Sequence, residues 1–138
     1  MTDGKALLRR WLEEVWNRGD VSLLDELHTA GFRDRTGNPG LTPDTAGMKQ
    51  VILTIRAAFP DAVFTIEDLV ADDDRVAARW TMRGTHNGEF NGMPATGRPL
   101  IMAGFGLVRI EDGRIAEFWH LEDDLAALRQ LGALPGLG

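Results

Sequence analysis

The side chains of this sequence that remain for chemistry are those of histidine, aspartate, glutamate, arginine and tryptophan. Its three histidines are His28, His86 and His120, and it contains no tyrosine. Ser22 is its single serine, and it lacks the Gly-x-Ser-x-Gly context of a hydrolase nucleophile. The absence of cysteine excludes thiolate nucleophiles and cysteine-ligated metals. This inventory favours general acid–base chemistry on an organic molecule.

His120 lies in the segment RIAEFWHL (114–121), which predicts a strand. Because side chains alternate along a strand, Ala116, Phe118 and His120 share one face. An imidazole, with an ordinary pKa near ~6.5, can take and return a proton near neutral pH. Two interpretations are open: a catalytic proton carrier in an apolar pocket, or a core histidine bonded to a backbone carbonyl.

Other charged residues near the predicted strands also have two interpretations. Asp123 either caps the last helix or orients a base or a water in the pocket, while Glu122 and Asp124 are expected to be solvated. Arg79 either pairs with a carboxylate on a neighbouring strand or holds a substrate oxygen in the pocket. Strand parity places Arg79 and Trp80 on opposite faces unless a bulge intervenes.

Aromatic and methionine side chains are expected to line the pocket, although such sets are often simply core. Trp11 and Trp16 lie about 140° apart around a helix, so that one packs in the core and Trp16 lines the pocket. His86 begins a loop at the pocket mouth, either solvated or in contact with a ligand. Gly104 and Gly106 leave bare backbone for sheet curvature or for a flat ligand. The remaining candidates for substrate binding are Trp80, Met102, Phe105 and Phe118.

The elements that position these residues follow from the change in hydrophobic period along the chain. Apolar residues recur with a helical period over 5–18, a second short helix follows Asp20 to about His28, and a third runs from Asp44 or Thr45 to Pro60. Strands are predicted at 62–70, 76–85, 100–110 and 114–121, a short strand surrounds Phe32, and a last helix ends near Leu131. Helices followed by two hairpins predict an α+β fold in a single domain, 1–138.

The charge and composition of the chain limit the kinds of molecule that it is expected to bind. The 138 residues carry a formal net charge of -6 with scattered basic residues, which argues against nucleic-acid and anionic-membrane surfaces. No apolar run reaches the ~18–20 residues of a membrane span, and the polar start predicts a cytoplasmic protein. Without glycine-rich phosphate loops or histidine pairs at ligand spacing, we expect neither a cofactor nor a metal.

Two blocks of the sequence are more specific than these patterns. The block Ala57–Gly97 and the tail Arg109–Gly132, which contains RIEDGRIAEFWHLEDDLAALRQLG, resemble the SnoaL-like polyketide cyclase (ester cyclase) family. The resemblance includes Trp-Asn-x-Gly-Asp at 16–20 and covers essentially the whole chain. It implies the cone of nuclear transport factor 2: a curved antiparallel sheet wrapped by helices around a pocket.

The resemblance also implies a chemistry, from which the chain departs at two places. Founding members close polyketide rings by an intramolecular aldol reaction without metal or cofactor, using an aspartate directly after the tryptophan of the last strand. In this sequence His120 follows Trp119, and the aspartate of the more distant limonene epoxide hydrolases also maps to position 120, counted from Ile115. Many relatives have a histidine where this chain has Arg33-Asp34-Arg35. The distant hydrolases carry a catalytic arginine on the strand of Arg79.

The resulting hypothesis is a cofactor-free enzyme of the lyase or isomerase type, with His120, Asp123 and Arg79 moving protons on a hydrophobic polyketide-like or cyclic carbonyl substrate. The alternatives are a non-catalytic binder with an apolar pocket, or water activation as in epoxide hydrolases. The expected partners are a small hydrophobic ligand and a second copy in a homodimer built through the strands.

Overall fold

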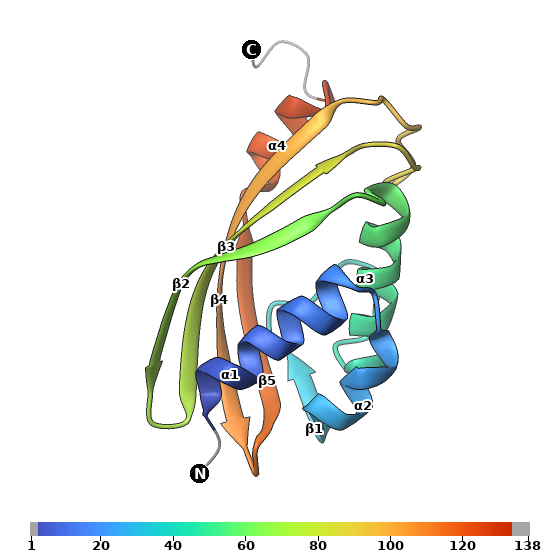
Figure 1. Cartoon of the computed structure of the whole chain (residues 1–138). Coiled ribbons are helices and arrows are strands. Elements are labelled where there is room, and N and C mark those ends of the chain that lie inside the picture. The colour runs from blue at the N-terminus through green and yellow to red at the C-terminus, as the bar shows by residue number, and fades with distance from the viewer. Residues whose placement is uncertain (1–2, 134–138) are drawn as a thin grey trace.

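The computed structural model describes residues 3–133 and confirms the predicted order of helices followed by strands (Figure 1). The helical elements are α1 (Gly4–Arg10), η1 (Trp11–Asn17, a π-helix), η2 (Val21–Leu23, a 3-10 turn), α2 (Leu24–Leu27), α3 (Thr45–Ala58) and α4 (Asp124–Gln130). The strands are β1 (His28–Asp34), β2 (Val63–Asp72), β3 (Arg75–Thr85), β4 (Pro99–Glu111) and β5 (Arg114–Glu122).

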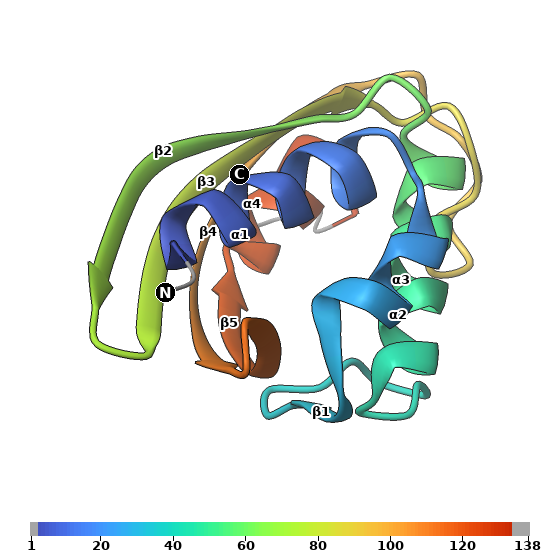
Figure 2. The same cartoon turned by 60° about the horizontal axis from the view of Figure 1, so that its bottom comes forward.

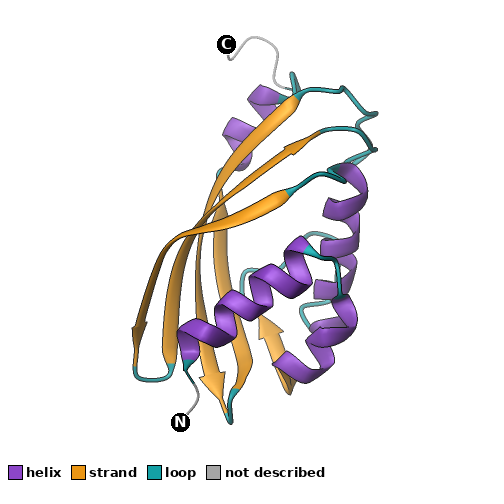
Figure 3. Ribbon diagram, in the orientation of Figure 1, coloured by secondary structure: helices purple, strands orange, loops and turns teal. Residues whose placement is uncertain are grey.

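The five strands form one curved sheet in the order β1-β5-β4-β3-β2. Strands β2 to β5 pair antiparallel, whereas β1 pairs parallel with β5. Figure 2 shows the sheet curving around α1, with α3 beside its open side, and Figure 3 shows these helices and strands as separate layers. The α+β fold with a curved sheet wrapped by helices is therefore confirmed.

Local sequence explains where the helices begin and end. The Asp3 side chain caps α1, and the Asp44 side chain accepts the Gly47 N–H at the start of α3. Pro60 follows the end of α3, as expected of a residue that cannot continue a helix. The last turn of η1 runs into Gly19, which has a φ of 75°.

Strand parity divides the sheet into an inner and an outer face. On β5, Ala116, Phe118 and His120 are buried, whereas Leu121 is 76% exposed. On β3, Ala78 and Met82 are buried while Arg79 is exposed. The predicted inward set of β5 is confirmed.

Trp80 fills the space that two glycines of β4 leave on the inner face. A Cβ at Gly104 would lie 2.5 Å from the Trp80 ring, and one at Gly106 would lie 2.8 Å from both Phe118 and Trp80. Trp80 and Gly104 are partners in the β3–β4 register. These glycines were expected to serve sheet curvature or a flat ligand; instead, their bare backbone accommodates a side chain of the protein itself.

The interior is consequently almost filled. The inner cavity measures about 20 Å³ and has an apolar lining, which is room for about one water molecule. Its wall combines side chains of α1 and η1 with the inner face of the sheet: Leu8, Trp11, Leu12, Ile66, Ala78, Trp80, Gly106, Val108 and Phe118. The predicted central pocket is present but much smaller than a polyketide. None of the helices described is both long enough and apolar enough to cross a membrane.

The contact between Trp80 and Gly104 predicts a specific cost of adding one methyl group. Gly104→Ala should lower the free energy of unfolding by about 1–3 kcal/mol, because the indole must leave its position. Gly31→Ala on β1 is the matched control, since nothing lies within 4 Å of its added Cβ. Equal urea midpoints for the two variants would contradict this account of Trp80.

Candidate active site

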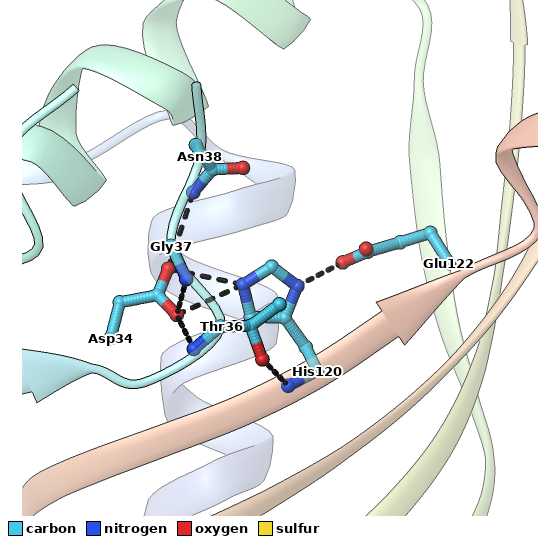
Figure 4. Close-up of polar contacts among 6 residues, drawn as sticks. All are labelled: Asp34, Thr36, Gly37, Asn38, His120 and Glu122. Carbon is cyan, nitrogen blue, oxygen red and sulfur yellow. Dashed lines mark hydrogen bonds and ion pairs between the residues drawn. The ribbon is translucent and has the colours of Figure 1, made fainter. Parts of the chain in front are cut away.

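A histidine between two carboxylates lies where β1 ends beside β5 (Figure 4). His120 Nε2 is 3.0 Å from both carboxylate oxygens of Asp34, and His120 Nδ1 is 2.5 Å from Glu122 Oε1. The His120 and Asp34 side chains are 6% and 4% exposed, and that of Glu122 is 26% exposed. Both ring nitrogens of a buried imidazole are thus engaged by carboxylates.

The loop after β1 fixes the Asp34 carboxylate. The backbone N–H groups of Thr36 and Gly37 donate to Asp34 Oδ1 at 3.1 and 2.9 Å, and Asn38 Nδ2 donates to Oδ2 at 3.2 Å. An aspartate that accepts bonds from residues two and three positions ahead is typical of a turn built on its side chain. The carboxylate is therefore oriented toward His120 by its own loop.

Strand β5 holds the imidazole from the other side. The His120 backbone N–H donates to Thr36 Oγ1 at 2.8 Å, which ties the strand to the same loop. The ring stacks on Phe118 with centroids 4.6 Å apart. Phe118 also borders the inner cavity, so one aromatic ring contacts both the imidazole and the cavity.

The surroundings of His120 favour its protonated form. Burial alone would lower its pKa, but the hydrogen bonds from the ring to Asp34 and Glu122 and their negative charges outweigh burial and raise the pKa to about 9. Burial raises the pKa of Asp34, yet the His120 bond and the loop donors bring it below its ordinary value. At neutral pH the site is an imidazolium between two carboxylates, and so a proton donor.

Known proteins of this fold share both sequence and architecture with the chain. The family model of the SnoaL-like polyketide cyclases matches residues 6–131. The chain belongs to this family. TsrD from Streptomyces laurentii is 32% identical, with 97% of this chain and 100% of that chain covered and a TM-score of 0.86.

Two further relatives support the membership. IdmH from Streptomyces antibioticus is 36% identical, with 92% of this chain and 96% of that chain covered and a TM-score of 0.78. The aklanonic acid methyl ester cyclase DnrD of Streptomyces peucetius is 42% identical over 57 residues, which are 41% of this chain. The chain spans about two fifths of that relative, 39% of its length.

The structure brings together the two places where this chain departs from the SnoaL-like pattern. The resemblance implied an aspartate at position 120 and a histidine near positions 33–35, and the chain has His120 and Asp34 instead. These two side chains touch at 3.0 Å. The chain thus has a histidine–aspartate pair, with the aspartate at the end of β1 and the histidine on β5.

Two of the three predicted catalytic residues lie elsewhere. Asp123 caps α4, because its side chain accepts the Ala126 N–H at 3.1 Å; the capping interpretation is correct. Arg79 lies on the outer face and pairs with Asp68 at 2.7 Å, so its placement in the pocket is wrong. The reason is strand parity: Trp80 takes the inward position on β3.

The predicted substrate-binding residues also separate into groups. Trp80 and Phe118 border the cavity. Met102 is half-buried and packs against a core cluster that includes Phe64 and Met82. Trp16 packs on Phe64 with centroids 5.2 Å apart, whereas Trp11 borders the cavity, so the assignment of Trp16 to the pocket is wrong. Phe105 is 61% exposed on the outer face, so its assignment to the pocket is wrong for the same reason of parity.

His86 does not lie at an open mouth, and this expectation is also wrong. It is fully buried, stacks obliquely on Phe59 at 5.4 Å, and its Nδ1 lies 2.9 Å from Thr96 Oγ1. The loop after β3 folds back over it, because the His86 N–H donates to the Arg98 carbonyl at 2.9 Å. His86 therefore anchors the loop to the core.

Sequence reasoning missed two of the three members of the site. Asp34 was noticed only as a departure from the family pattern, and Glu122 was expected to be solvated. The parity of β5 was the available signal for Glu122, since it lies two positions from His120 and on the same face. Within residues 3–133, no three histidine, aspartate or glutamate side chains are grouped in a way that could hold a metal ion.

The remaining histidine, His28, is also buried and forms a separate structural site. His28 stacks on Phe32 with centroids 3.7 Å apart, and Trp11 Nε1 donates to its Nε2 at 3.1 Å. Because Nε2 accepts, the ring proton lies on Nδ1, 3.0 Å from Thr45 Oγ1. Burial lowers the pKa of His28 to about 3, so this imidazole is neutral in the folded protein.

The raised pKa of His120 predicts a loss of stability on the alkaline side. Folding stabilises the protonated ring, so its contribution is complete below pH 6.5 and disappears as the pH rises to about 9. The loss in the free energy of unfolding should be on the order of 3 kcal/mol. Urea unfolding across this range should show the loss in the wild type and not in His120→Gln. If the free energy of unfolding changes with pH in the same way in both proteins, His120 is not held in its charged form by Asp34.

The lowered pKa of His28 predicts a loss of stability on the acidic side. Its unfolded form binds a proton below pH 6.5 while its folded form stays neutral, so stability declines as the pH falls from 6.5 toward about 3. His28→Gln should be less stable at pH 6.5 but should lose less on acidification. Urea unfolding of the two proteins measures this difference; an equal acid loss would show that His28 does not titrate in this range.

Proposed function

We propose that the protein is a cofactor-free acid–base enzyme that catalyses an intramolecular aldol-type cyclisation or isomerisation of a hydrophobic, polyketide-like carbonyl substrate. The observation that carries the proposal is the buried Asp34–His120 pair beside an apolar cavity. The cyclase name of the relative DnrD supports the same reaction class.

The chemistry requires one proton to leave carbon and one to reach oxygen. The proton α to a carbonyl leaves to water, which returns one to His120 at the end of the cycle; the resulting enolate carbon attacks a second carbonyl carbon of the same molecule, forming a C–C bond. The new alkoxide oxygen takes a proton, so a ring alcohol forms without loss of atoms. The His120 imidazolium hydrogen-bonds the developing oxyanion and supplies that proton, and Asp34 keeps the imidazolium charged and oriented.

The cavity of about 20 Å³ has to enlarge when such a substrate binds. Trp80 and Phe118 border it from the sheet, and Leu8 and Trp11 border it from the helix. Apolar side chains on all sides favour a substrate whose surface is mostly hydrocarbon or aromatic. The epoxide-hydrolase alternative is weaker, because Arg79 lies on the outer face away from His120.

The proposal predicts the behaviour of an exchanged pair. His120→Ala should reduce turnover by about 100- to 10,000-fold, and Asp34→His alone should do the same, since two basic rings then face each other. The double variant Asp34→His/His120→Asp should recover part of the activity. Turnover is measured on a panel of polyketide-like ketones, including aklanonic acid methyl ester, by product formation and by deuterium uptake α to the carbonyl.

Melting temperatures of the same variants distinguish catalysis from mere binding. A catalytic pair loses turnover per folded molecule, whereas a histidine that only fills space lowers the melting temperature and leaves activity per folded molecule intact. If His120→Ala retains full deuterium uptake when folded, the acid–base role is wrong and a binding function remains.

We also propose that the protein is a homodimer built through the outer face of the sheet. Phe105 and Leu121 lie directly opposite each other on β4 and β5, and both are exposed, together with Ile101. Contiguous apolar groups on a sheet face are typical of an interface. Light scattering should give twice 15.2 kDa, and Phe105→Glu should give the monomer mass. Leu53→Glu, at an exposed apolar position on α3, is the control; a wild-type monomer would contradict the proposal.

A further inference from the structure

The two carboxylates that flank His120 are held in unequal ways. Asp34 is 4% exposed and accepts hydrogen bonds from Thr36, Gly37 and Asn38 in addition to His120. Withdrawing it would break three hydrogen bonds of its own loop in addition to the charged contact with His120. The contact at Nε2 is therefore fixed.

Glu122 has no comparable support. It is the last residue of β5, its side chain is 26% exposed, and within residues 3–133 its carboxylate has one hydrogen-bond partner, His120 Nδ1. A glutamate side chain at the end of a strand can turn into solvent by rotating about its own bonds, with no movement of the backbone. The contact at Nδ1 can therefore open while the rest of the site stays in place.

Neighbouring charges weaken the Glu122 contact further. Asp123 and Asp124 follow Glu122 directly, and burial together with the charges of Glu122 and Asp123 raises the pKa of Asp124. The groups that act on His120 are thus Asp34 from β1, Glu122 on β5 itself and Asp124 from α4. Repulsion among the acidic residues favours the outward position of Glu122, and only the imidazolium opposes it.

Because both ring nitrogens are occupied, an oxygen of a ligand can reach the imidazole only by displacing a carboxylate. We propose that Glu122 is an internal, displaceable occupant of an oxygen-binding position at His120 Nδ1. A carbonyl, enolate or carboxylate oxygen of a ligand takes this position when Glu122 swings out. The inference deepens the proposed function, on which it rests: Nδ1 faces the substrate, and Nε2 stays with Asp34.

The assignment makes Glu122 a positioning residue that closes the site in the absence of ligand. While bound, it keeps Nδ1 protonated and shielded from water. When displaced, it leaves a buried N–H donor directed at the incoming oxygen, and its own charge moves to solvent. The preferred ligand is therefore one whose oxygen carries at least partial negative charge, since it must replace a carboxylate.

The experiment opens the position and fills it with a small probe. Glu122→Ala and Glu122→Gln are labelled with 15N in the histidine rings, and both nitrogens of His120 are followed during pH titration and during addition of sodium acetate. Sodium chloride at equal ionic strength is the control for screening. Glu117→Gln is the control variant, because Glu117 lies on the same strand but pairs with Arg35 and Arg109 on the outer face.

In Glu122→Ala, the pKa of His120 should fall from about 9 toward 6.5, and in Glu117→Gln it should not change. Acetate should bind Glu122→Ala at least about tenfold more tightly than the wild type, since it need not displace a charged hydrogen-bond partner. It should raise the pKa of His120 again. At a pH where the ring is already fully protonated, it should shift the Nδ1 signal and leave the Nε2 signal unchanged.

The inference is overturned if acetate leaves both nitrogens unchanged, if it shifts Nε2 instead, or if the wild type binds it as tightly. None of these readings depends on turnover. If acetate binds at Nδ1 but no ketone is enolised in a His120-dependent manner, the proposed function is wrong and the oxygen position stands. If turnover depends on His120 but acetate does not bind, the oxygen position at Nδ1 is wrong and the proposed function stands.

Discussion

The contact between Asp34 and His120 joins two parts of the fold that are far apart in sequence. Asp34 ends β1 among the helices, and His120 lies near the end of the last strand, 86 positions later. A buried imidazole is stable in its charged form only beside a fixed negative charge, and a buried carboxylate requires donors. Each group therefore depends on the other, and both depend on the parallel pairing of β1 with β5.

The parallel pairing of β1 with β5 brings the two halves of the site together. The antiparallel strands form a curved wall, and its concave face is covered by α1 and η1. Strand β1 adds to the edge of the wall beside β5, so the loop 34–38 comes to lie against the inward side chains of β5 (Figure 4). The apolar interior next to it, with Trp80 seated on Gly104 and Gly106, keeps the medium around the pair poor in water.

Much of the fold was predictable because the periodicities are strong. The helical stripe of 5–18, the Asp-Gly turn before Arg114 and the parity of β5 all depend on local sequence, and the structure agrees with them. The wrong assignments of Arg79 and Phe105 to the pocket have the same cause. The sequence does not show which face of a half-apolar strand turns inward, because that depends on where Trp80 finds room across the sheet. Asp34 was also beyond local reasoning, since its partner is 86 positions away.

The central claim is that His120 is held as an imidazolium by a buried carboxylate. Titration of the 15N-labelled His120 ring in the wild type and in Asp34→Asn tests it most directly. The account predicts a pKa of about 9 in the wild type, with both nitrogens protonated at neutral pH, and a marked fall in Asp34→Asn. A wild-type pKa at or below 6.5, or one that Asp34→Asn leaves unchanged, would contradict it.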